Sequence, residues 1–82
     1  MIILNEEEWE NFMKSVLEND GVAIFKNTDH ADGYQDFNTT IIRQHDTIYI
    51  FQEYINYTNN EKEYDCVRIT EEELNKLKEV VI

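Results

Sequence analysis

Two alternating stretches in the middle of the chain decide its fold: FNTTIIRQ (residues 37–44) and TIYIFQEYINY (residues 47–57). Both are rich in Ile, Thr and aromatic residues, and their polar and apolar positions alternate with a period of two, which is typical of β-strands. Between them lies QHD (residues 44–46), a turn-forming cluster. Strands joined by so short a connection pair antiparallel, because parallel strands need a long crossover.

The strand pattern continues on both sides of this hairpin. Further strands are predicted at residues 21–26, a short, apolar and β-branched stretch, and at residues 64–69, where the alternating pattern recurs. The intervening DHADG (residues 29–33) and TNNE (residues 58–61) contain the residue types that favour turns, and no proline interrupts any strand. The sequence therefore predicts a four-stranded antiparallel meander.

A helix is predicted before the meander, over residues 5–19. In LNEEEW, Asn5 stands at an N-cap position with Glu8 three residues later, and Leu4 and Trp9 have the spacing of a hydrophobic staple. One helical face then carries the apolar residues Trp9, Phe12, Met13, Val16 and Leu17.

A second helix is predicted over residues 70–80. ITEEEL repeats the first arrangement, with Thr70 as N-cap and Glu73 closing the capping box. Two amphipathic helices flanking a meander predict an α+β fold, with an N-terminal helix, a four-stranded antiparallel meander and a C-terminal helix. We expect the helices to cover one face of the sheet in a two-layer sandwich.

The two predicted helix starts also explain why most of the clustered glutamates stand where they do. Residues 6–8 and 71–73 fall in the first turns, where carboxylates interact favourably with the helix dipole. Glu10 lies four residues after Glu6 and adds a like-charge pair, so some acidity of the first helix has no such explanation.

Size and charge restrict the classes of function. The 82 residues form one domain (1–82), which we expect to fold alone or as a small oligomer such as a homodimer. Seven Lys and Arg against eighteen Asp and Glu give a formal charge of −11. Nucleic acids and anionic membranes are therefore poor direct ligands, whereas a basic nucleic-acid-binding protein is a suitable partner. The single cysteine and an N-terminus without a secretory pattern predict the cytoplasm.

The sequence gives no pattern for an enzyme, a metal site or a cofactor. Cys66 lies within a predicted strand and is expected to act as a small hydrophobic residue. His30 and His45 have no metal-ligand spacing around them. In the calcium-loop alignment of DHADGYQD, Thr28 and Thr39 occupy the positions where Asp and Glu are required.

One pattern favours an interaction surface. Glu61, Glu63 and Asp65 alternate along a predicted strand, so their side chains should project from one face about 6.5 to 7 Å apart, near the spacing of backbone phosphates. The alternative is a solvated strand whose charges prevent edge pairing. The other residues that we expect to contribute to partner binding are Asp36, Asp46, Glu53, Tyr57 and Tyr64. Tyr49 and Tyr54 could add contact area, although some tyrosines must be core.

In its small size, strong acidity and cytosolic type of N-terminus, the chain resembles the phage-encoded inhibitors of host defence: anti-CRISPR proteins, anti-restriction DNA mimics and the uracil-DNA glycosylase inhibitor. The resemblance is one of type and rests on no shared motif. It implies an inhibitor that occupies the nucleic-acid-binding surface of a nuclease or repair enzyme, in the host cytoplasm if a phage encodes it. The main alternative is a cytosolic adaptor or regulatory subunit without DNA mimicry.

Overall fold

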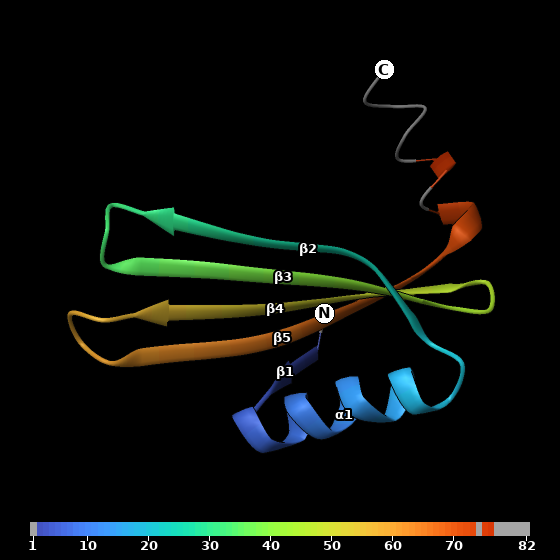
Figure 1. Ribbon diagram of the computed structural model, residues 1–82, viewed down its shortest axis with the longest axis horizontal. Helices are drawn as coiled ribbons and strands as arrows, with labels where there is room; N and C mark the ends of the chain where they lie inside the picture. The colour runs from blue at the N-terminus through green and yellow to red at the C-terminus, as the bar shows by residue number, and fades with distance from the viewer. Residues whose placement is uncertain (1, 74, 77–82) are drawn as a thin grey trace.

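The computed structural model describes residues 2–73 and 75–76, and in this part of the chain a 13-residue helix packs against a single five-stranded sheet (Figure 1). In chain order the elements are β1 (Ile2–Leu4), α1 (Glu6–Glu18), β2 (Val22–Ala31), β3 (Gln35–Gln44), β4 (Thr47–Asn56) and β5 (Glu61–Thr70). Residues 71–73 and 75–76 are also helical.

The sheet confirms the predicted antiparallel meander and adds one strand to it. Its strand order is β1-β5-β4-β3-β2, and every neighbouring pair is antiparallel. The two outer strands of the meander are longer than predicted, because β2 continues to Ala31 and β5 already begins at Glu61. The additional strand is β1, whose Ile2 and Leu4 lie opposite Cys66 and Tyr64. Three residues are too few to produce an alternating pattern, so local sequence gave no signal for this strand.

Helix α1 confirms the prediction for residues 5–19 and begins with the predicted capping box. The Asn5 side chain accepts a hydrogen bond from the backbone N–H of Glu8 at 2.8 Å, and the Glu8 side chain accepts one from the Asn5 backbone. At the other end Asp20 has a φ of 68°, and Gly21 N–H donates to the Val16 carbonyl at 2.9 Å. A Cβ atom on Gly21 would lie 2.3 Å from that carbonyl oxygen, so a glycine is required there.

The core lies between α1 and one face of the sheet. The Trp9 ring contacts those of Phe51 and Tyr64, with centroids 6.0 and 5.3 Å apart. Phe12 packs edge-on against Tyr49 and Phe51 at 5.6 Å each. Complete burial of a side chain such as Phe51 contributes about 1.5 to 3 kcal/mol, so this aromatic cluster holds α1 on the sheet.

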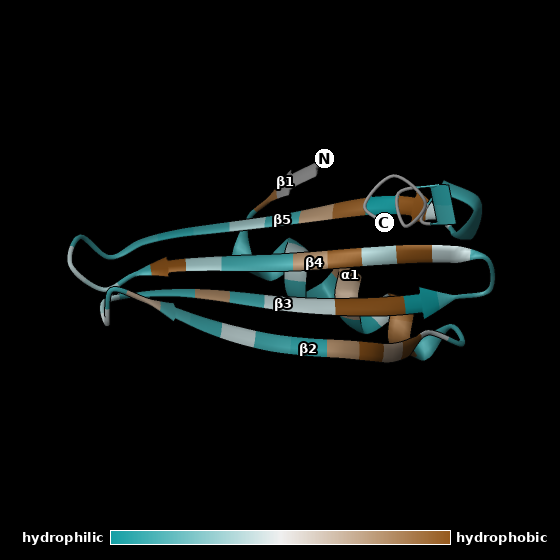
Figure 2. Cartoon of the chain, turned by 90° about the horizontal axis from the view of Figure 1, so that it is seen from above, coloured by the Kyte–Doolittle hydropathy of each residue, from teal (hydrophilic) through white to brown (hydrophobic). Residues whose placement is uncertain are grey.

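The two halves of the sheet differ in character. Figure 2 shows hydrophobic residues concentrated in the half of the strands near the β3–β4 turn, and mostly hydrophilic residues toward the other two hairpin turns. Asp32, His45 and Asn60 adopt a φ near +58° in the three hairpin turns. Asp and Asn tolerate this left-handed conformation better than most residues, which explains the turn clusters recognised in the sequence.

After β5 a helical turn leaves the sheet on the side away from α1 (Figure 1). Thr70 Oγ1 accepts a hydrogen bond from Glu73 N–H at 3.1 Å, which confirms the predicted N-cap bond. Glu71 N–H donates to the Asp46 carbonyl at 2.9 Å, and the Glu71 carboxylate pairs with Arg43. These contacts hold the start of the second predicted helix at the β3–β4 turn. Residue 74 and the part of that helix beyond residue 76 lie outside the described residues.

Candidate functional site

The acidic row, which consists of Glu61, Glu63 and Asp65 on β5, lies on the face of the sheet that α1 does not cover. We call this face the open face. Tyr64 and Cys66 face α1, as members of the core cluster. Alternate residues of a strand point to opposite faces, and the β4–β5 register runs without a bulge. The side chains of Glu61, Glu63 and Asp65 therefore project from the open face.

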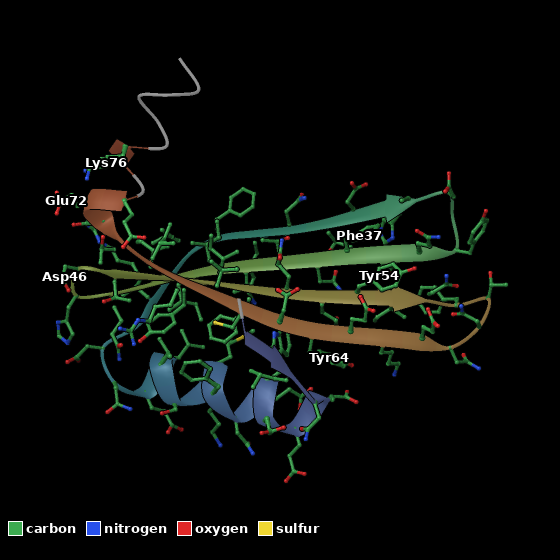
Figure 3. All side chains as sticks on the ribbon, turned by 180° about the vertical axis from the view of Figure 1, so that it is seen from behind. Phe37, Asp46, Tyr54, Tyr64, Glu72 and Lys76 are labelled. Atoms are coloured by element: carbon green, nitrogen blue, oxygen red, sulfur yellow. The ribbon has the colours of Figure 1, made fainter. Side chains whose placement is uncertain are left out.

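Two of these carboxylates line a depression in the open face, in the polar half of the sheet. Its volume is about 450 Å³. Phe37 and Tyr54 form one wall as a tilted aromatic pair with centroids 5.0 Å apart, and Glu63 and Asp65 line it from β5. Figure 3 shows Phe37 and Tyr54 close together on neighbouring strands. The remaining lining residues are Gln35, Asn38, Thr39, Gln52 and Glu53.

Asp65 is the most constrained carboxylate of the acidic row. Its Oδ1 is shielded from solvent and accepts no hydrogen bond from the described residues. Burial raises the pKa of the Asp65 carboxyl above its ordinary value, and the charge of Glu63 raises it further. The Asp65 backbone is fixed separately, because its carbonyl accepts a 2.9 Å hydrogen bond from Trp9 Nε1. Lys, Arg and His are absent from the described lining of the depression, so the two carboxylates have no cationic neighbour within it.

The side chains of Asp36 and Glu53 point to the other face of the sheet, the face on which α1 packs. Asn38 Nδ2 donates to Glu53 Oε1 at 2.7 Å. The Tyr57 hydroxyl donates to Asp36 Oδ2 at 2.7 Å, and His30 contacts the other oxygen of the same carboxylate. The hydrogen bond from Tyr57, followed by that from His30, lowers the pKa of the Asp36 carboxyl below its ordinary value. The same hydrogen bond, followed by burial, raises the pKa of the Tyr57 hydroxyl.

Tyr64 and Asp46 lie apart from both groups. Tyr64 is only 5% exposed and sits between the sheet and α1, as Figure 3 shows. Burial, followed by the charge of Glu6, raises the pKa of its hydroxyl to about 12. Asp46 belongs to the β3–β4 turn at the opposite end of the sheet from the depression. Of the predicted partner-binding residues, the structure thus brings Glu63, Asp65 and Glu53 to the depression, although the Glu53 side chain points to the opposite face. Glu61 comes next on the strand face of Glu63.

The sequence reasoning missed the aromatic wall. The sequence pattern assigned Phe37 only to a strand, and it suggested Tyr54 only as added contact area. In the sheet, the side chains of both residues point to the open face. The strand register pairs Tyr54 directly with Phe37 on one side and with Glu63 on the other, and residues directly opposite each other share a face of the sheet. That register was not available before the strands were paired.

The described residues offer little for covalent or metal chemistry. Cys66 is fully buried in the core, and burial raises the pKa of its thiol to about 11, which keeps it protonated at neutral pH. Within residues 2–73 and 75–76, no three His, Cys, Asp or Glu side chains converge as a metal site. None of the helices in this part of the chain has the length and hydropathy needed to cross a membrane.

Comparison of the chain with protein-family models, curated proteins and solved structures found no match in any of the three.

Proposed function

We propose that the protein is a small acidic inhibitor that acts in the cytoplasm by blocking the nucleic-acid-binding surface of an enzyme. The target class is a nuclease or repair enzyme, CRISPR effectors included. Carboxylates on the open face stand where phosphates of the nucleic acid would lie. The inhibitor itself binds protein and performs no catalysis.

One observation carries this proposal: Glu61, Glu63 and Asp65 project from the sheet face that α1 does not cover, and no described residue lining the adjoining depression is basic. Like charges on one strand face repel each other, and no helix dipole offsets that repulsion here. A basic groove would relieve it. With the formal charge of −11, the open face would also accelerate association with a positively charged partner.

A second candidate function is a cytosolic adaptor or regulatory subunit without phosphate mimicry. Val22, Ile24 and Phe25 favour it, because they are 61, 51 and 51% exposed on the edge strand β2 and could contact a partner independently of charge. The two functions differ in their expected response to salt.

The test begins with immobilised protein and a lysate of the source cell, with bound proteins identified by mass spectrometry. Under the inhibitor proposal, the partner is a nucleic-acid-binding enzyme that excess duplex DNA displaces. Its affinity also falls steeply as salt rises from about 0.05 to 0.5 M, because screening shortens the range of the charge interactions. A partner that is retained through both treatments would favour the adaptor and overturn the inhibitor proposal.

A charge variant locates the surface. Replacement of Glu61, Glu63 and Asp65 by Gln, Gln and Asn preserves side-chain size while removing three charges. The expected result is slower association at low salt and weaker inhibition, with an unchanged or higher Tm. The matched control neutralises Glu7, Glu10 and Glu18, which are exposed on α1. If the control slows association as much as the strand variant, only total charge matters and the acidic row has no special role.

A further inference from the structure

The depression beside the acidic row combines two features that suit one kind of ligand. Its Phe37–Tyr54 pair offers aromatic surface, with Phe37 41% exposed, and Glu63 and Asp65 supply negative charge from β5. Aromatic faces attract cations because the ring quadrupole is negative above the plane. Carboxylates attract the same cations directly. The depression therefore selects positive charge, and its volume of about 450 Å³ is sufficient for a side chain to enter.

The partly buried Asp65 makes the binding of a donor more favourable. Its Oδ1 accepts no hydrogen bond from the described residues, although the residue as a whole is only half-buried and lines the depression. A cation beside the accessible part of this carboxylate would offset the unfavourable desolvation of its charge. Gln35 and Gln52 add side-chain amide oxygens among the lining residues, which can accept further hydrogen bonds.

Geometry favours a guanidinium over the other common cations. A guanidinium is planar, stacks on aromatic rings and presents five N–H donors, whereas an ammonium is compact and strongly hydrated. A divalent metal is not favoured, because the described residues contain no converging set of three ligands. Arginine is also frequent on surfaces that bind phosphate.

We infer that the depression formed by Phe37, Tyr54, Glu63 and Asp65 receives an arginine side chain of the basic partner. The guanidinium stacks against the aromatic wall and donates hydrogen bonds to the carboxylates. This inference rests on the proposed function and adds a specific contact to it: the acidic row provides long-range attraction, and the depression provides recognition at close range.

The test uses hexa-arginine, hexalysine and hexacitrulline peptides as probes of the isolated protein. Binding is followed by NMR with labelled backbone amides and aromatic side chains. Hexa-arginine should bind at least about tenfold more tightly than hexalysine, since a bidentate stacked contact adds more than about 1.4 kcal/mol. Hexacitrulline, which keeps the shape without the charge, should bind most weakly. The largest shifts should occur at Phe37, Tyr54, Gln52 and Asp65.

Two variants and one control assign the contact. Asp65→Asn removes the charge, and Tyr54→Leu removes the aromatic face; each should weaken hexa-arginine binding by about tenfold and abolish its preference over hexalysine. Glu72→Gln, in the helical turn after β5, should change neither value. Thermal melts establish that each variant is folded. Equal binding of hexa-arginine and hexalysine to the wild-type protein, or unchanged preference in both variants, would overturn the inference.

Failure of this inference can be distinguished from failure of the proposed function. If the cellular partner is displaced by DNA and salt while the peptides show no preference for arginine, the depression is not an arginine site and the inhibitor proposal stands. If hexa-arginine binds in the depression but the partner is insensitive to DNA and salt, the depression recognises arginine in a protein that is not a nucleic-acid mimic.

Discussion

Trp9 on α1 donates its indole N–H to the backbone carbonyl of Asp65 on β5, at 2.9 Å. These residues are 56 positions apart in the chain, and the bond joins the helix to the strand that carries the acidic row. The backbone of Asp65 is thereby fixed from one face of the sheet while its carboxylate lines the depression on the other. The packing of the core and the geometry of the candidate site are coupled through this bond.

The first prediction tests that coupling through the variant Trp9→Phe. Phenylalanine preserves an aromatic ring but leaves the Asp65 carbonyl without its donor, so unfolding free energy should fall by about 1 to 3 kcal/mol. Chemical denaturation gives the value. Met13→Leu is the matched control, because it alters a partly buried α1 residue without removing a hydrogen bond and should cost less than about 1.5 kcal/mol. Equal losses in the two variants would mean that the indole hydrogen bond contributes nothing of its own.

The second prediction concerns the helix starts. Asn5→Ala and Thr70→Ala each remove an acceptor for a backbone N–H, at 2.8 and 3.1 Å, and should each cost roughly 0.5 to 2 kcal/mol. Association with a partner should change little. Thermal melts of Asn5→Asp and Thr70→Ser provide the controls, because both keep an oxygen at the cap. If the alanine variants melt at the wild-type temperature, capping does not account for the positions of the glutamate triplets.

The third prediction follows from the raised pKa of Asp65. The folded protein binds a proton at this carboxyl more tightly than the unfolded chain does, so ionisation of Asp65 lowers stability at neutral pH. This cost diminishes as pH falls through the raised pKa and is gone below the ordinary value of 3.8. Asp65→Asn should therefore have a higher Tm than the wild type at pH 7, and the difference should shrink with acidification.

Thermal melts of Asp36→Asn provide the opposite case, because the pKa of the wild-type Asp36 carboxyl is lowered in the folded protein. Asp36 stabilises the fold above pH 3.8, and this contribution is lost as pH falls through the lowered value. The variant should therefore be less stable than the wild type at pH 7. A Tm advantage of Asp65→Asn that stayed constant from pH 7 to the acid range would assign its effect to packing rather than to charge.

Local signals were sufficient to predict α1 and the meander. The Asn5–Glu8 capping box, the spacing of Trp9 and Phe12, and the period-two stretches each involve residues close in sequence, so each could be recognised without knowing the fold. Strand β1 depends instead on pairing with residues 64–66, which are 60 to 64 positions away, and three residues provide no pattern of their own.

The candidate site was predicted less well, because alternation tells which residues share a face but not which face a helix covers. Tyr64 and Asp65 are adjacent in one strand and must point to opposite sides of the sheet, so they could not both belong to one surface. The structure places Tyr64 beneath α1 and Asp65 at the depression. The side chains of Asp36 and Glu53 point to the same side of the sheet as Tyr64. There Asp36 accepts a hydrogen bond from Tyr57, and Glu53 accepts one from Asn38.

The strand order also governs how the protein can be made. The hairpins of the meander join neighbours in the chain, so these contacts can form early and quickly. Helix α1 is synthesised before any strand of the meander, yet its Trp9 packs against Tyr64 on the last strand. During translation, the apolar face of α1 can therefore be buried against β5 only after β5 has emerged from the ribosome. Because the first helix packs against β5, this part of the core can form only after all four strands of the meander have been synthesised.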